Sequence, residues 1–159
     1  MSETLLIVLH EWAEQAMLRS MNALIRFNQS NGLTFSQSNS LFFLKNEPQA
    51  TINDLADHLG ITKAAVSQLV ERMVGQGLVN RQEDPQDRRS KRLTLTPLGD
   101  TIVEEAWHAR HAWLEELVKT YTPAQQEMLE PALNLLIDGL HRINREKNIA
   151  VNPIKNARE

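Results

Sequence analysis

The stretch TINDLADHLGITKAAVSQLVERMVGQG, residues 51–77, contains two helical patterns that a very short turn separates. The first pattern opens with Thr51 and Asp54, a hydroxyl N-cap with an acidic residue three positions later, which resembles a capping box. Gly60 breaks this helix, and Thr62 then caps the second one. Two short helices joined by a tight glycine turn predict a helix-turn-helix.

The second helix of this pair has two different faces. Apolar residues at the helical period form one face, which we expect to be buried: Val66, Leu69, Val70 and Met73. The outward face presents Ala64, Ser67, Gln68 and Glu71, with Lys63 and Arg72 at its margins and Thr62 at its start. Such a helix fits the major groove of DNA, where Gln68 can pair bidentately with adenine, Ser67 can bond a base or a phosphate, and Ala64 can touch a thymine methyl group.

After this helix the pattern changes to that of a β-hairpin. Residues 78–83 and 92–96 are predicted as two short strands, in which Leu93 and Leu95 alternate with polar neighbours. The polar segment DPQDRRSK, residues 84–91, forms the loop between them. A hairpin directly after a helix-turn-helix predicts a winged helix-turn-helix. The predicted fold class is therefore mainly α, with a small β-hairpin wing.

Positive charge is concentrated in the predicted wing. The whole chain has a net charge of −3, which is unusual for a nucleic-acid-binding protein. Residues 86–96, however, carry Arg88, Arg89, Lys91 and Arg92 against Asp87 alone. Arginines at a hairpin tip can enter the narrow minor groove, where A·T-rich sequence concentrates negative potential. We therefore expect the wing to contact DNA through Arg88, Arg89 and Lys91.

Longer helices are predicted on both sides of this segment. One helical period runs through residues 3–30, and the pair Asn31 and Gly32 ends it. Thr34 and Gln37 form a capping box that opens a helix to about residue 45. On the other side, Thr96 followed by a proline is an N-cap that starts a helix to about residue 119.

A last helix is predicted over residues 123–147, after a second Thr-Pro start at Thr122. Its apolar residues recur about every 3.5 positions, the spacing of helices that pack against helices. These residues are Leu129, Leu133, Leu136, Leu140 and Ile143. Pro131 is expected to kink or interrupt the first turns of this helix. Residues 148–159 show no apolar period and are expected to form a flexible tail.

Residues 51–99 resemble the DNA-binding lobe of the MarR family of bacterial transcription regulators. The resemblance is carried by LADHLG at 55–60, VSQLV at 66–70 and GLV at 77–79, and most specifically by DPQDRR at 84–89 leading to Leu95, Thr96 and Gly99. It implies a single MarR-like domain over residues 1–159, with a winged-helix DNA-binding lobe at 34–96. Residues 1–31 and 97–147 would be dimerisation helices, because they fall where the family has them.

The same resemblance implies a function. The protein is expected to be a homodimer that binds a roughly palindromic operator in double-stranded DNA, to act as a repressor, and to be released by a small-molecule effector. Arg89 would be the minor-groove arginine, and Asp87 would brace the wing. The recognition helix departs from the commonest pattern, because Gln68 stands where arginine is frequent and Ala64-Ala65 replaces residues that are often polar. The bases that it reads are therefore not implied.

Two further sets of residues are candidates for ligand binding. By the resemblance, an effector pocket between the dimerisation helices and the lobe would be lined by Trp12, Met21, Phe42, Trp107, His108, His111 and Trp113. The favoured alternative is that the Trp, Met and Phe residues belong to the core and that the two histidines lie on a helix surface. His108 and His111, with Glu104 and Glu105 upstream, have residue types and a spacing that suit zinc. They define an alternative, a metal-responsive regulator, but no full ligand set is recognised, and no cofactor or metal is predicted.

Other classes of protein find little support in the sequence. No phosphate loop, nucleophile elbow, Cys/His pair or pair of clustered carboxylates is present, so an enzyme is not expected. The lack of cysteine suits the cytoplasm, and the sequence predicts neither a signal peptide nor a membrane span. A winged helix that binds another protein instead of DNA remains the second alternative, favoured by the negative net charge and opposed by the basic wing.

Overall fold

The structure is a computed structural model, and it describes residues 2–83 and 91–147. Six helices and two strands follow one another in the described ranges: α1 (Glu3–Ser30), α2 (Phe35–Asn46), α3 (Ile52–Leu59), α4 (Lys63–Gly75), β1 (Val79–Glu83), β2 (Lys91–Leu95), α5 (Pro97–Lys119) and α6 (Pro123–Glu146). This mainly helical fold with one antiparallel hairpin confirms the predicted fold class. The predicted loop tip with Asp87, Arg88 and Arg89, and the predicted tail at 148–159, lie outside the described residues.

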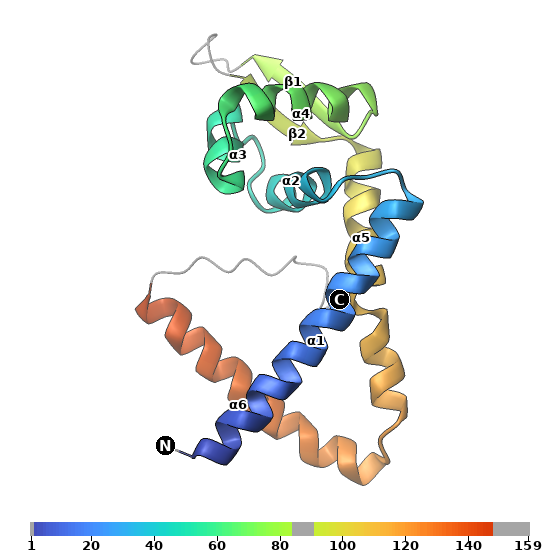
Figure 1. The fold of residues 1–159 in the computed structure, drawn as a ribbon, viewed down its shortest axis with the longest axis vertical. Coiled ribbons are helices and arrows are strands. Elements are labelled where there is room, and N and C mark those ends of the chain that lie inside the picture. The colour runs from blue at the N-terminus through green and yellow to red at the C-terminus, as the bar shows by residue number, and fades with distance from the viewer. Residues whose placement is uncertain (1, 84–90, 148–159) are drawn as a thin grey trace. The chain divides into compact units, whose positions relative to one another are not determined.

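The chain divides within α5 into two compact units, residues 1–110 and residues 111–159. The first unit holds α1 to α4, the hairpin and the first turns of α5, and in it α2, α3, α4 and the two strands gather into one lobe (Figure 1). The second unit holds the rest of α5 and α6.

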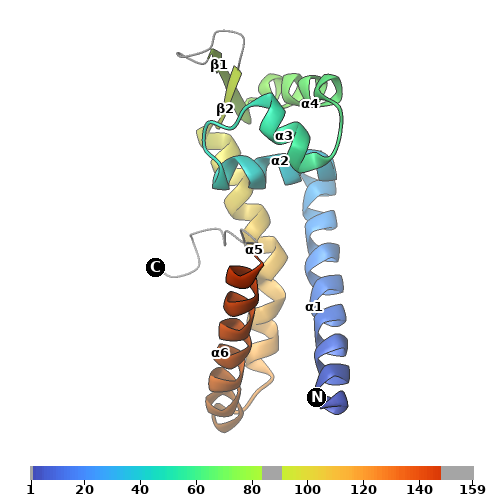
Figure 2. The same cartoon turned by 90° about the vertical axis from the view of Figure 1, so that its left-hand side faces the viewer.

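The core of the first unit lies between the elements of the lobe. Its fully buried side chains come from every one of those elements and from α5, and the largest are Leu41, Leu44, Leu55, Val66, Val70, Met73, Val79, Leu93 and Val103. Helix α1 contributes to this core only through its C-terminal turns, where Leu24 and Asn28 are its buried residues. Figure 2 shows the same arrangement, with the end of α1 reaching the lobe where α2 begins.

The predicted helix starts are confirmed by their capping contacts. Capping boxes with both reciprocal hydrogen bonds open α2 at Thr34, α3 at Thr51 and α6 at Thr122. At the start of α4, the Thr62 hydroxyl accepts a hydrogen bond from the backbone N–H of Ala65 at 3.3 Å. Each cap satisfies backbone donors that have no partner inside the helix, which is why these starts are visible in sequence.

The two strands pair in antiparallel register, with Val79 opposite Leu95 and Glu83 opposite Lys91. The end of β1 is as predicted, whereas its start and both ends of β2 differ by one residue from the predicted bounds. Leu78 does not begin β1, because its backbone N–H donates to the carbonyl of Met73 at 2.9 Å and closes the end of α4. The hairpin also gains a partner, since Leu93 exchanges backbone hydrogen bonds with the segment before α3, at Gln49 and Ala50.

The second unit is a helical pair joined at a short turn. Backbone hydrogen bonds from Thr120 and Tyr121 to the last turn of α5 close that helix, and the Gln126 amide donates to the carbonyls of Val118 and Tyr121. Helix α6 continues through Pro131, so of the predicted kink or interruption at this proline, the interruption does not occur. No residue of α6 is buried in the single chain.

The helices in the described part of the chain include none that is long and apolar enough to cross a membrane.

Candidate nucleic-acid interface

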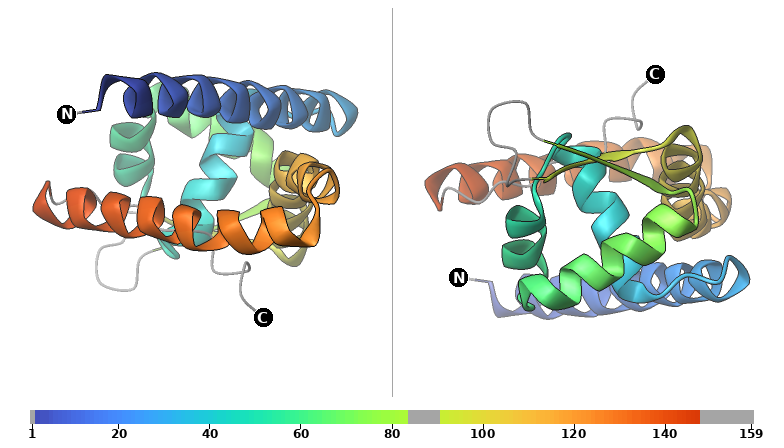
Figure 3. Two further views of the ribbon diagram at one scale, coloured as in Figure 1. Left: turned by 90° about the horizontal axis from the view of Figure 1, so that it is seen from below. Right: turned by 90° about the horizontal axis from the view of Figure 1, so that it is seen from above.

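Helix α4 separates its residues into a buried and an exposed face, as predicted. Val66, Leu69, Val70 and Met73 are all at most 4% exposed and pack into the core. The predicted DNA-reading residues lie on the other side: Thr62, Lys63, Ala64, Gln68 and Arg72 are exposed, and Ser67 is half-buried. Viewed from above, α4 and the hairpin strands lie nearest to the viewer (Figure 3, right). The exposed face of α4 is thus a polar surface on a rigidly packed helix.

The turn before α4 fixes where this helix begins. Gly60 adopts the left-handed conformation with φ 64°, which an L side chain rarely adopts. The backbone N–H of Ile61 donates to the carbonyl of Ala56 at 3.3 Å, which closes α3. Thr62 follows as the N-cap of α4, so only Ile61 separates Gly60 from the start of this helix.

At the base of the wing, Lys91 forms an ion pair that sequence reasoning did not anticipate. Its Nζ lies 2.7 Å from the Glu83 carboxylate, on the facing strand. The hydrogen bond from Lys91, with the attraction of its charge, lowers the pKa of Glu83 below its usual value. Lys91 therefore begins β2 and does not lie in the predicted loop, and its ammonium group is paired with a carboxylate across the hairpin. The register alone could have revealed this pair, because Glu83 and Lys91 are cross-strand partners.

Arg92, the next residue of β2, is tied to the segment before α3. Its guanidinium donates a hydrogen bond to the side-chain carbonyl of Gln49, before α3. Gln49 itself has a positive φ of 71°, a backbone conformation that is uncommon outside glycine. The contact joins residues 43 positions apart, so no local pattern indicates it.

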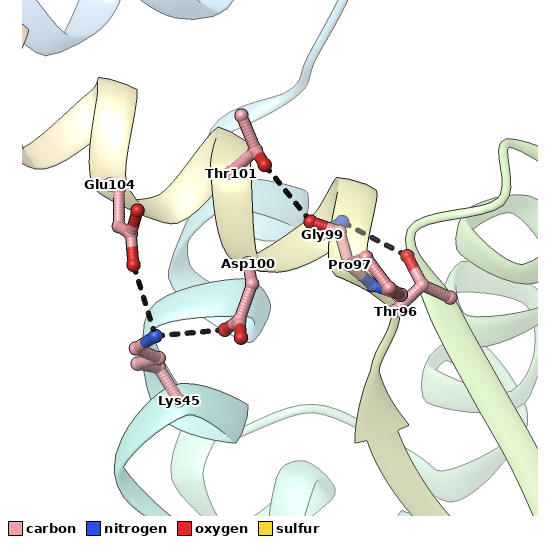
Figure 4. A network of polar contacts seen from close by, with 7 residues as sticks. All are labelled: Lys45, Thr96, Pro97, Gly99, Asp100, Thr101 and Glu104. Atoms are coloured by element: carbon pink, nitrogen blue, oxygen red, sulfur yellow. Dashed lines mark hydrogen bonds and ion pairs between the residues drawn. The ribbon is translucent and has the colours of Figure 1, made fainter.

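A network of hydrogen bonds and ion pairs connects the hairpin, α5 and α2 at the other end of β2 (Figure 4). The Thr96 hydroxyl donates to the carbonyl of Gly77 at 2.6 Å and accepts from the backbone N–H of Gly99 at 3.0 Å, which confirms Thr96 as the N-cap of α5. Lys45, on α2, lies 2.9 Å from the carboxylate of Asp100 and 3.5 Å from that of Glu104. These contacts hold the first turns of α5 against the lobe that carries α4 and the wing.

The residues predicted for an effector pocket are spread over three helices. On α1, Trp12 is 51% and Met21 37% exposed, while Phe42 on α2 is half-buried. On α5, Trp107 and His111 are half-buried and His108 is exposed, with the rings of Trp107 and His108 edge to face at 5.2 Å. The predicted lining residue Trp113, also on α5, is half-buried. Within residues 2–83 and 91–147, no three His, Cys, Asp or Glu side chains group in a way that could hold a metal ion.

A helix-turn-helix whose second helix presents a polar face, followed directly by a hairpin, is a winged helix-turn-helix. Comparisons with known proteins agree with this class. The model of the MarR family matches residues 31–90. The transcriptional regulator AdcR of Streptococcus pneumoniae is 30% identical over 108 residues, which cover 66% of this chain and 73% of that protein. The chain belongs to the MarR family of transcription regulators.

Solved structures show the same fold. The transcriptional regulator Tm0710 from Thermotoga maritima superimposes with a TM-score of 0.75 at 23% identity, covering 89% of this chain and 96% of that one. The F27L mutant of MepR from S. aureus, bound to an oligodeoxyribonucleotide, superimposes with a TM-score of 0.61 at 24% identity, covering 88% of this chain and 99% of that one.

Proposed function

We propose that this MarR-family regulator binds double-stranded DNA with α4 in the major groove and with the basic wing in the adjacent minor groove. The observation that carries the proposal is the two-faced α4, whose exposed side presents Gln68 and Lys63 while its opposite side is anchored in the core. A helix anchored in this way can hold side chains at the edges of bases. The arginines Arg88 and Arg89 predicted for the wing lie in the sequence between β1 and β2.

The protein acts as a homodimer on a roughly palindromic operator. Support for this comes from the apolar residues that the single chain leaves exposed on α6, among them Leu133 at 43%, Leu140 at 58% and Ile143 at 47%. Helix α1 likewise exposes Leu5, Ile7, Val8, Trp12, Met17 and Leu18. Monomeric proteins rarely leave so much apolar side chain in water. A two-fold axis would place two α4 helices in successive major grooves.

Repression and release by a small-molecule effector complete the proposal. A dimer seated on a promoter excludes other proteins from that DNA, and a ligand that binds the free dimer better than the bound one would weaken the complex. Trp12, Met21, Phe42, Trp107, His108 and His111 remain the proposed effector-binding residues.

DNA binding is tested with duplexes that the purified protein itself selects from a random-sequence pool. Titrations at several salt concentrations should show affinity falling steeply with salt, because contacts to phosphates release counterions. Arg89→Ala should abolish tight binding to the selected duplex while leaving the oligomeric state unchanged. Arg110→Ala, which removes an exposed arginine from α5, serves as the control. If no sequence is enriched, the alternative of a protein-interaction module gains support; unchanged affinity in Arg89→Ala would overturn the minor-groove assignment.

A further inference from the structure

Gln37, at the start of α2, makes two connections from a buried position. It is 5% exposed. Its side-chain oxygen accepts hydrogen bonds from the backbone N–H of Thr34 at 2.8 Å and from the Thr34 hydroxyl at 3.1 Å. Its Nε2 donates to the side-chain oxygen of Gln76 at 2.7 Å. Gln76 is the C-cap residue of α4, so the amide links the start of α2 to the end of the proposed recognition helix.

The capping box determines which way this amide points. A backbone N–H can only donate a hydrogen bond, so Gln37 must present its oxygen to Thr34. Its NH₂ group is then directed toward α4, where a buried donor requires an acceptor. Gln76 supplies that acceptor. Apolar contacts along α4 would permit a helix to shift along its neighbours, whereas a hydrogen bond weakens steeply once distance or angle departs from its optimum.

The next residue of α2 connects to α1. The hydroxyl of Ser38, which is 3% exposed, donates to the side-chain oxygen of Asn28 at 2.5 Å. Asn28 is itself 5% exposed, and its backbone carbonyl accepts from Leu33 at 2.8 Å. Adjacent residues of α2 therefore hold the end of α1 through Ser38 and the end of α4 through Gln37. All three helices in this connection belong to the first compact unit.

We propose that the Gln37–Gln76 hydrogen bond is a positioning contact for α4, and that the series Asn28–Ser38–Gln37–Gln76 couples the position of α1 to that of α4. This inference rests on the proposed function, because it assigns α4 the role of reading DNA. Gln37 and Gln76 touch no base in this assignment. They act through the placement of the side chains that do, so their loss should lower discrimination between sequences more than it lowers attraction to DNA.

The contact is tested by Gln76→Met and Gln76→Glu. Gln76 is exposed, and neither change touches the capping box of α2, so both variants should fold. Methionine replaces the amide oxygen with a thioether sulfur, which is only a weak acceptor, whereas a glutamate carboxylate still accepts a strong hydrogen bond from Gln37. Two affinities are measured for each protein: for a duplex that the wild-type protein selects from a random pool, and for a shuffled duplex of the same composition. The added charge of glutamate affects both affinities similarly and cancels in their ratio.

We expect Gln76→Met to lower the ratio of selected to shuffled affinity by roughly threefold to tenfold, the effect of losing one hydrogen bond, with the salt dependence for shuffled DNA unchanged. Gln76→Glu should restore most of the ratio. A wild-type ratio in Gln76→Met overturns the positioning role, and so does a loss of stability in urea without a change in the ratio. Failure of the wild-type protein to select any sequence would instead count against the proposed function.

Coupling to α1 is tested with Ser38→Ala, alone and combined with Gln76→Met. If the two bonds act in series, the double variant should lose no more of the affinity ratio than the worse single variant. Losses that simply multiply would show that the two bonds act independently, and would overturn the coupling while leaving the first result in place.

Discussion

Gly99 stands where α5 passes the hairpin at very short range. A Cβ built on it would lie 2.1 Å from the carbonyl oxygen of Leu78 and 3.1 Å from its carbonyl carbon. Both atoms belong to the backbone, so they cannot move aside as the end of a flexible side chain could. The position therefore requires glycine because of space, not because of its dihedral angles.

Gly99→Ala should lower the free energy of unfolding by about 1–3 kcal/mol, the usual cost of forcing extra volume into a packed site. Urea denaturation measures the change. Gly75→Ala is the matched control, because a Cβ at Gly75 would meet nothing within 4 Å and alanine is the better helix former. Equal stability of Gly99→Ala and the wild-type protein would show that α5 does not pass Leu78 as closely as described.

Among the outward residues of α4, Gln68 is the one whose side chain can distinguish bases most specifically, through a bidentate hydrogen-bonded pair with adenine. Its side chain is exposed about one and a half turns from the capped start of the helix. Gln68→Ala should cost about 1–3 kcal/mol at one or two operator positions if it pairs bidentately with a base. Binding to a panel of single-base operator variants measures this. A uniform loss over all variants would instead assign Gln68 to the DNA backbone.

At the scale of elements, the contacts that could be predicted from the sequence are those between residues close together in the chain. The caps at Thr34, Thr51, Thr62 and Thr122 were predictable because each cap and its partner lie three residues apart. The buried face of α4 was predictable because it repeats with the helical period. Contacts such as Lys45 with Asp100 join residues 55 positions apart, and only the folded chain brings them together.

In the candidate site, too, the local features were predictable from the sequence and the long-range contacts were not. The outward residues of α4 were predictable from the same periodicity that buries its other face. The ion pair of Lys91 with Glu83 was not predicted, because it depends on the register of the hairpin, and the sequence pattern placed Lys91 in the loop, one residue before the predicted second strand. The roles of Gln37 and Gln49 depend on long-range partners that composition and spacing do not reveal.

The ion pair between α2 and α5 should depend on pH in a definite direction. The hydrogen bond with Asp100 raises the pKa of Lys45 above its ordinary value of 10.5, against the opposing effect of burial. A group whose pKa is raised on folding stabilises the fold below its unfolded pKa and loses this contribution as the pH rises through its folded pKa. The contribution of Lys45 is therefore complete at neutral pH and is lost above about 10.5.

A double-mutant cycle with Lys45→Met and Asp100→Asn should give a coupling of roughly 0.2–1 kcal/mol at pH 7, because Asp100 is about half exposed and solvent screens the pair. Urea denaturation of the four proteins supplies the values, and Lys63→Met controls for the loss of a lysine elsewhere. A coupling that persists unchanged above the folded pKa of Lys45 would contradict an ionic origin.

At the scale of the whole molecule, the exposed apolar face of α6 decides between a monomer and an assembly. Leu140 is 58% exposed in the single chain, and Leu133, Leu136 and Ile143 continue its face at helical spacing.

Leu140→Glu should weaken the proposed homodimer, because it would place a charge in an apolar contact. Arg142→Gln makes the same change in net charge about 200° further around the helix, and should leave the dimer intact. Sedimentation over a range of protein concentrations measures the dissociation constant, and titration of the selected duplex should show operator affinity falling along with dimerisation. A monomeric wild-type protein that still binds the full duplex tightly would refute the dimer, whereas dissociation by Leu140→Glu alone would assign this face of α6 to the contact between the two copies.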